Sequence, residues 1–299
     1  MAASCLETIN LTKRFGKFTA LGGINLRVDE GEAFGYIGPN GSGKTTTIRV
    51  LLGILKATEG QAKVFGMDAW KYATEIHRRV AYVPGDVSLW PNLTGGEVVD
   101  LFVKLRGRFD KARRDKLLEM FELDPTKKCR AYSKGNRQKV ALVAAFASDA
   151  DIFILDEPTS GLDPLMELVF RECVAEQKSN GKVIFLSSHI LSEVERLCDR
   201  VGIIREGRLV ETGTLSELRH LTRVFVSVET ELPIPDVAEV RGVHSVEERN
   251  GVLSFRADSA EIGNIISYIS KYKLKKIECA PPALEDLFMR HYGADKKAL

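Results

Sequence analysis

The order of hydrophobic and polar positions predicts a series of strands and helices up to about Leu215. Residues 6–11 alternate apolar and polar side chains and, like residues 24–28, predict a strand. Short, mostly apolar runs predict further strands at residues 33–37, 80–83, 151–155 and 183–187. Helices are expected over residues 44–55, most of 68–122, 136–147 and 164–179. Strands that alternate with helices in this way indicate an α/β domain with a largely parallel sheet.

The pattern changes after Leu215. Short strands are predicted at residues 225–228, 243–247 and 252–255, and near Ile277. Asn250-Gly251, between two of these strands, is typical of a hairpin turn. Helices are expected over residues 261–273 and 284–291. We therefore expect one domain over residues 1–219 and a small α+β domain over residues 220–299.

The composition narrows the class of protein. With 44% hydrophobic and 28% charged residues, the 299-residue chain is neither disordered nor fibrous. Its 43 basic and 41 acidic residues leave a formal charge of +2, which gives no overall field for nucleic acid. The longest apolar run, residues 140–147, is far shorter than the roughly 20 residues that span a bilayer, and no basic-then-apolar leader opens the chain. We expect a cytoplasmic protein that reaches membranes only through a partner.

The cysteines agree with that expectation. They are scattered and form no C-x-x-C pair, so reduced thiols are expected rather than disulfides or a zinc site. They are Cys5, Cys129, Cys173, Cys198 and Cys279.

A phosphate-binding loop is predicted between the strand at residues 33–37 and the helix that follows. Residues 38–45, Gly-Pro-Asn-Gly-Ser-Gly-Lys-Thr, fit the pattern G-x-x-x-x-G-K-[ST]. Its glycines let backbone N–H groups approach phosphate closely at the start of a helix. Lys44 would reach the β- and γ-phosphates, and the Thr45 hydroxyl would ligate Mg²⁺. The sequence therefore predicts a site for a nucleoside triphosphate.

Two adjacent acids, Asp156 and Glu157, follow the apolar run of residues 152–155. The carboxyl ends of parallel strands are where open sheets bind ligands. Asp156 is expected to hold Mg²⁺, and Glu157, pointing elsewhere, suits a general base for the attacking water.

Further segments resemble motifs of the ABC ATPases. Residues 132–138, Tyr-Ser-Lys-Gly-Asn-Arg-Gln, are similar to the LSGGQ signature, with Lys134 and Asn136 as departures. Residues 160–163 resemble the D-loop and residues 187–189 the segment of the switch histidine. Alone, the signature segment would be a common helix cap and His189 a structural residue. The five motifs in the family's order identify the chain as similar to ATP-binding subunits of bacterial drug and antibiotic exporters, and the ending Pro-Pro-Ala-Leu-Glu-Asp-Leu-Phe resembles their accessory domain.

The resemblance implies a fold and a set of roles. The fold is a P-loop NTPase of ABC type, with a mixed sheet, a helical subdomain over about residues 86–148 and the small α+β domain after it. Phe15 stacks on adenine, and His189 binds the γ-phosphate. The signature contacts the ATP of the opposite subunit in a homodimer. The residues implied to contact ATP in the same subunit are Phe15, Gly38, Pro39, Asn40, Gly41, Ser42, Gly43, Lys44, Thr45 and Thr46; those at the opposite ATP are Ser133, Lys134, Gly135 and Asn136; the D-loop comprises Ser160, Gly161, Leu162 and Asp163.

One position departs from the family in a way that concerns catalysis. Gly85 stands where the family's Q-loop places a Gln, and Asp86 is a candidate substitute. We expect ATP binding to survive this change and the hydrolysis rate to depend on it.

The leading hypothesis is an ATPase with ATP and Mg²⁺ as cofactors, which powers a separate membrane permease that exports a drug-like or hydrophobic compound. The permease would dock near residues 89–107, where Trp90, Leu93, Phe102 and Leu105 are either apolar anchors or ordinary core. The alternatives are a soluble ABC ATPase that acts on ribosomes or DNA, and a nucleotide-gated regulator with little turnover.

Overall fold

The computed structural model describes residues 4–107, 110–220, 224–249 and 251–280. The chain divides into two compact units, Met1–Thr212 and Gly213–Leu299. Whether the functional boundary lies at residue 219, as the sequence predicts, stays a prediction. Among the described helices, none has both the length and the apolar character that crossing a bilayer requires.

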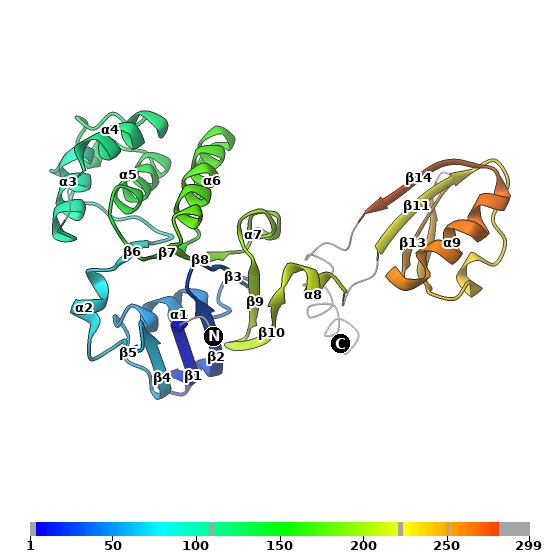
Figure 1. Ribbon diagram of the computed structural model, residues 1–299, viewed down its shortest axis with the longest axis horizontal. Coiled ribbons are helices and arrows are strands. Elements are labelled where there is room, and N and C mark those ends of the chain that lie inside the picture. Colours follow the sequence, from blue (N-terminus) through cyan, green and yellow to red (C-terminus); the bar gives the residue numbers. More distant parts are fainter. Residues whose placement is uncertain (1–3, 108–109, 221–223, 250, 281–299) are drawn as a thin grey trace. The chain divides into compact units, whose positions relative to one another are not determined.

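A six-stranded sheet forms the centre of the first unit (Figure 1). Its strands are β3 (Ala33–Ile37), β6 (Val80–Val83), β7 (Ile152–Asp156), β8 (Val183–Ser188), β9 (Arg200–Arg205) and β10 (Arg208–Thr214). The order is β10-β9-β3-β8-β7-β6, and β9, β3, β8, β7 and β6 run parallel. The predicted parallel arrangement is therefore present, while β9 and β10 were not predicted.

Helices cover both faces of this sheet. Successive residues of a strand point to opposite faces. On one face of β3, Gly35 leaves room for Val194 of α7 (Leu191–Leu197); on the other, the Tyr36 hydroxyl lies 3.3 Å from Thr47 Oγ1 of α1 (Lys44–Leu51). The helix α6 (Pro164–Ser179) spans the predicted range and packs against β8. The helix α1 ends before the predicted residue 55, because Gly53 adopts a φ of 65°.

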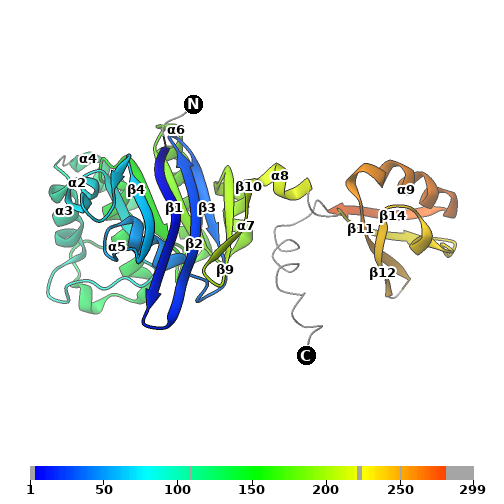
Figure 2. The same ribbon diagram turned by 90° about the horizontal axis from the view of Figure 1, so that it is seen from below.

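A second, antiparallel sheet lies beside α1 (Figure 2). Its order is β2-β1-β4-β5, with β1 (Ser4–Phe15), β2 (Phe18–Asp29), β4 (Glu59–Val64) and β5 (Met67–Asp68). The first two strands are longer than predicted. The strands β4 and β5 were not predicted; in β4 only Ala62 and Val64 are buried, and the strand begins with Glu-Gly.

The helical part of the first unit contains α3 (Gly95–Leu105), α4 (Lys111–Met120) and α5 (Lys134–Phe146), with the short α2 (Ala73–His77) before it. A capping box between Thr94 and Glu97 starts α3, and Ser133 caps α5. The expectation of mostly helix over residues 68–122 was wrong for the segment between β6 and Thr94, which is loop. Its Gly, Pro and Asn residues favour turns over a helix.

In the described part of the second unit, the helix α9 (Ile262–Ile269) lies against an antiparallel sheet. The order is β12-β13-β11-β14, with β11 (Val224–Thr230), β12 (Val243–Arg249), β13 (Val252–Ala257) and β14 (Leu274–Ala280). The helix α9 (Ile262–Ile269) contributes Ile265 and Ile269 to a core around Phe255. A further short helix, α8 (Leu215–His220), precedes this sheet.

Arg249 pairs with Val252, which leaves two residues for the predicted hairpin turn, although Asn250 itself lies outside the described residues. The expected helix over residues 261–273 ends at Ile269, followed by a 3₁₀ turn and Lys273 with a φ of 56°. The predicted helix over 284–291 lies outside the described residues.

Candidate nucleotide site

The loop between β3 and α1 has the backbone that the glycine pattern predicts. Gly41 and Gly43 adopt φ values of 81° and 112°, which side-chain-bearing residues rarely adopt. A Cβ atom on Gly43 would also lie 2.8 Å from Leu21 Cδ2. The helix α1 begins at the next residue, so its unpaired N–H groups and the positive end of its dipole face the loop. This geometry suits an anion such as phosphate.

Lys44 is held inside this loop, with 5% of its surface exposed. Its Nζ donates hydrogen bonds to Gly38 O at 2.6 Å and to Pro39 O at 3.2 Å. The same Nζ lies 3.4 Å from Glu157 Oε1. The loop therefore holds a cation in a fixed position. A phosphate that binds there would replace some of the contacts that the carbonyl and carboxylate groups make with Lys44 Nζ.

Asp156 is buried at the end of β7 and receives two hydroxyl groups. Thr45 Oγ1 donates to Asp156 Oδ2 at 2.9 Å, and Ser187 Oγ of the neighbouring strand donates to Oδ1. Hydroxyl and carboxylate oxygens together match the ligands that Mg²⁺ prefers. Among the described residues no group of three or more His, Cys, Asp or Glu side chains could hold a metal.

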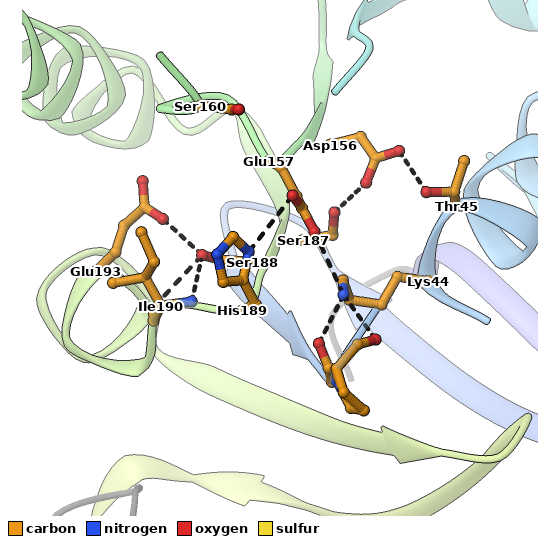
Figure 3. Close-up of polar contacts among 12 residues, drawn as sticks. Lys44, Thr45, Asp156, Glu157, Ser160, Ser187, Ser188, His189, Ile190 and Glu193 are labelled. Atoms are coloured by element: carbon orange, nitrogen blue, oxygen red, sulfur yellow. Dashed lines mark hydrogen bonds and ion pairs between the residues drawn. The ribbon is translucent and has the colours of Figure 1, made fainter. Parts of the chain in front are cut away.

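Glu157 lies between the loop lysine and His189 (Figure 3). Its backbone has a φ of 48°, in the left-handed region, and its N–H donates to Ser187 O at 2.9 Å. Backbone strain of this kind clusters at functional sites. The carboxylate reaches Lys44 through Oε1 and approaches His189 Nδ1 through Oε2, at 3.4 Å each. With about a quarter of its side chain exposed, Glu157 can contact both water and a bound ligand.

A cleft of about 340 Å³ lies over the loop. Such a volume is within the usual range for small-molecule sites. Its walls include the residues expected to contact ATP in the same subunit, except Gly38 and Ser42. The lining residues are Phe15, Phe18, Ala20, Pro39, Asn40, Gly41, Gly43, Lys44, Thr45, Thr46 and Glu157.

Phe18 was missed by the sequence analysis. It faces Phe15 across the two-residue turn between β1 and β2, and 48% of Phe15 and 67% of Phe18 are exposed. Two exposed rings at the mouth of a cleft offer flat surfaces for an aromatic base. The signal in the sequence was the pair of aromatic residues around Gly16-Lys17, of which only the first was assigned a role.

The signature segment and the D-loop contact each other. Lys134 Nζ donates to Ser160 Oγ at 2.9 Å, and a Cβ atom on Gly135 would lie 2.5 Å from Gly161 O. Ser133 Oγ accepts the N–H of Asn136 at 3.2 Å as the cap of α5.

The D-loop leads directly into α6. The Leu162 N–H donates to Thr159 O, and the Asp163 side chain caps α6. No residue of the signature or the D-loop belongs to the described lining of the cleft, although the Ser160 N–H donates a 3.1 Å hydrogen bond to Glu157 O at its edge.

Gly85 packs against the end of β7. An added Cβ atom would lie 3.2 Å from Asp156 O and 3.7 Å from Glu157 Cβ, so this position is adjacent to both acids. Asp86 is exposed and does not line the cleft. The proposed substitution of Asp86 for the absent Gln stays a prediction.

Comparisons with known proteins place these features in context. A family model described as ABC transporter matches residues 21–160. The bacitracin transport ATP-binding protein BcrA of Bacillus licheniformis is 33% identical, over 97% of this chain and 98% of its own length. The protein of the same name from Enterococcus faecalis is 36% identical over 75% of this chain and 74% of its own. The probable multidrug ABC transporter ATP-binding protein YbhF of Escherichia coli (strain K12) is 34% identical, over 72% of this chain and 38% of its own length.

Solved structures give the same picture. An ATP-binding subunit of an ABC transporter is 34% identical with a TM-score of 0.68, over 73% of this chain and 92% of its own. A dimeric ATP-binding cassette in a post-hydrolysis state, bound to ADP and Pi, is 26% identical with a TM-score of 0.64, over 70% of this chain and 98% of its own.

Proposed function

Because this chain belongs to the ABC transporter family as an ATP-binding subunit, we propose that ATP lies in the cleft, with its phosphates in the loop of residues 38–46. Such subunits hydrolyse ATP to power transport, so the chain is an ATPase. The adenine stacks on Phe15, with Phe18 beside it. Lys44 contacts the β- and γ-phosphates, and the N-terminus of α1 supplies backbone donors.

The Thr45 hydroxyl and the Asp156 carboxylate hold a magnesium ion in this proposal. Their 2.9 Å hydrogen bond supports the assignment, because it brings two oxygen ligands together before any ion is bound. The ion, when bound, neutralises charge on the β- and γ-phosphates. Ser187 fixes the second carboxylate oxygen and so orients Asp156.

The observation that carries the proposed hydrolysis is the position of Glu157 between Lys44 and His189. Glu157 accepts a proton from the water that attacks the γ-phosphate, which requires an acceptor close to the phosphate and within reach of water. His189 lies on the other side of Glu157 from Lys44 and donates a hydrogen bond to the γ-phosphate. Bringing these groups into place together, rather than any single contact, lowers the barrier.

The second half of the site comes from another copy of this chain. Ser133 and Gly135 stand at the N-terminus of α5, where backbone donors and the helix dipole favour a phosphate. Their own cleft does not include them, so they are available to the ATP of a partner. The dimeric form of a related cassette supports a homodimer closed by ATP.

A separate membrane permease is the partner that ATP hydrolysis by this subunit powers. An apolar groove of about 490 Å³ is lined by Ile54, Tyr82, Phe102 and Leu105, among others, and 68% of Leu105 is exposed. Trp90 packs near Phe102, with ring centroids 6.0 Å apart, and remains 52% exposed. The groove suits an apolar segment of a permease, which would hold this subunit at the membrane surface.

The transported compound is assigned only as a class. Relatives are named for bacitracin and multidrug transport, which supports export of a drug-like or hydrophobic compound and favours transport over a role at ribosomes or on DNA.

Phosphate release from Mg-ATP tests the proposed roles. Glu157→Gln and His189→Ala should each lower kcat, by about 10² to 10⁴ for the base, while ATP still binds. Glu248→Gln, at an exposed position in the second unit, is the matched control and should hydrolyse at the wild-type rate. Turnover that survives in Glu157→Gln would refute the assignment of the base. Leu105→Asp should weaken co-purification with the permease without lowering ATPase activity of the isolated subunit.

A further inference from the structure

Glu193 is a buried carboxylate behind the catalytic groups. It lies on α7, four residues after His189, with 8% of its surface exposed. Its Oε2 accepts a hydrogen bond of 2.7 Å from Ser188 Oγ. Its Oε1 is buried and has no hydrogen-bond partner among the described residues. Burying a carboxylate costs free energy unless hydrogen bonds or a paired charge compensate for the lost water, so this partly unpaired group calls for an explanation.

Burial raises the pKa of Glu193, and hydrogen bonds from Ser188 and Thr159 oppose that shift. Thr159 follows Glu157 by two residues, whereas Ser188 directly precedes His189. Through Ser188 the carboxylate contacts the segment that carries the proposed γ-phosphate ligand, and Thr159 belongs to the segment of the proposed base.

Ser188 connects Glu193 to the backbone next to His189 through two hydrogen bonds (Figure 3). Its Oγ donates to Glu193 and also accepts the N–H of Ile190 at 3.0 Å. The hydroxyl thus ties down the residues on both sides of His189. The His189 side chain is itself half exposed, and its Nδ1 lies 3.4 Å from Glu157 Oε2.

Helix capping does not explain Glu193. The helix α7 begins at Leu191, and its capping residue, Ile190, offers no side-chain acceptor. In a capping box the Glu of the first turn would reach the backbone N–H of the capping residue. Here the Glu193 side chain reaches a serine two residues before that position, on the other side of His189. The contact therefore serves the loop more than the helix.

We propose that Glu193 is a positioning residue: through Ser188 it holds the His189 segment at the distance from Glu157 that hydrolysis requires. This role rests on the proposed function of Glu157 and His189. ATP binding depends on Phe15 and the phosphate loop, which Glu193 does not touch, so loss of the contact acts on turnover rather than on affinity. Misplacement of a catalytic group by about 1 Å can cost about 10²-fold in rate.

Steady-state ATPase kinetics of the purified chain test the proposal. Glu193→Ala should lower kcat about tenfold or more and change KM for ATP by less than about threefold. Glu193→Gln should recover most of the activity, because its amide oxygen can still accept the Ser188 hydrogen bond. Ser188→Ala should act like Glu193→Ala, and the double variant should be no slower than the slower single one, as residues of one network are not additive. Ser192→Ala, an exposed position on the same helix, is the control.

The outcomes distinguish the positioning role of Glu193 from the proposed roles of Glu157 and His189. Wild-type kcat in both Glu193→Ala and Ser188→Ala would overturn it, provided that Glu157→Gln stops turnover in the same assay. Full turnover in Glu157→Gln would instead refute the proposed function itself. If Glu193→Ala does not fold, Ser188→Ala and Glu193→Gln decide. A Gln variant as slow as the folded Ser188→Ala variant would also contradict the proposal, since the acceptor alone should suffice.

Discussion

The Thr45 hydroxyl donates a 2.9 Å hydrogen bond to Asp156 Oδ2, although 111 residues separate the two in the sequence. One residue belongs to the first turn of α1 and the other to the end of β7. Both side chains offer oxygen ligands, and this contact is the divalent-cation site that we propose.

Thr45→Ala should therefore raise the Mg²⁺ concentration needed for half-maximal ATPase activity by about tenfold or more. Even the mutation of residues that contact only the ligands of a metal lowers metal affinity or activity by about 10- to 100-fold. Thr45→Ser keeps the hydroxyl and should stay within about threefold of the wild type. A magnesium titration of the rate compares the three proteins. Equal magnesium dependence in Thr45→Ala would exclude this residue as a ligand.

Lys44→Ala removes the cation that the phosphate loop holds. Hydrogen bonds to charged groups contribute about 1.5–3 kcal/mol, so ATP affinity should fall by at least about tenfold. Isothermal titration with ATP measures the change, and Lys71→Ala, at an exposed lysine, should bind normally. Unchanged affinity in Lys44→Ala would contradict the assignment of the loop.

Gly85→Gln restores the side chain that the family's Q-loop carries. The new Cβ atom would lie 3.2 Å from Asp156 O, which needs a shift of only a few tenths of an ångström. We expect the variant to raise basal ATPase activity severalfold, and Gly85→Ala, which adds the Cβ atom alone, to leave it unchanged or lower. A flat rate in Gly85→Gln together with a collapse in Asp86→Ala would show that Asp86 performs this role.

Gly135→Ala should separate the signature from the D-loop. Its Cβ atom would meet Gly161 O at 2.5 Å, so the backbone of one segment must move. ATPase activity should fall about tenfold or more, since the segment that faces the partner's ATP is displaced, while ATP affinity of the monomer stays within about twofold. Gly263→Ala is the control: nothing lies within 4 Å, and an Ala in α9 should stabilise the second unit by up to about 1 kcal/mol. Normal turnover in Gly135→Ala would argue against a role for this contact.

The elements that the sequence predicted well are those with a strong local signal. The buried strands β3 and β6 and the helix α6 agree with their predicted bounds, because uninterrupted apolar runs and a Pro at the start of a helix leave few alternatives. The strand β4 was missed because it pairs with β1 through its backbone, while only Ala62 and Val64 of its residues are buried. Pairing between distant segments leaves no such signal in a single sequence.

The site shows the same division. The spacing of the phosphate loop predicted Lys44 and Thr45, and the structure brings Asp156 and Glu157 to them. Glu193 could not be predicted, since a Glu in the first turn of a helix is usually exposed. The contact of Lys134 with Ser160 likewise depends on how α5 and the D-loop meet, which local patterns do not specify.

In the proposed function, two copies of this chain enclose ATP, and Glu157 is the base for its hydrolysis. Glu157→Gln keeps the shape of the side chain and removes the base, so bound ATP should hold the closed dimer by mass action. Size-exclusion chromatography with light scattering should show Glu157→Gln as a dimer with Mg-ATP and as a monomer with ADP. Adding Ser133→Arg should return the Mg-ATP sample to a monomer that still binds nucleotide, because Ser133 serves the opposite site. A Glu157→Gln protein that binds ATP and stays monomeric at every concentration would contradict autonomous homodimerisation.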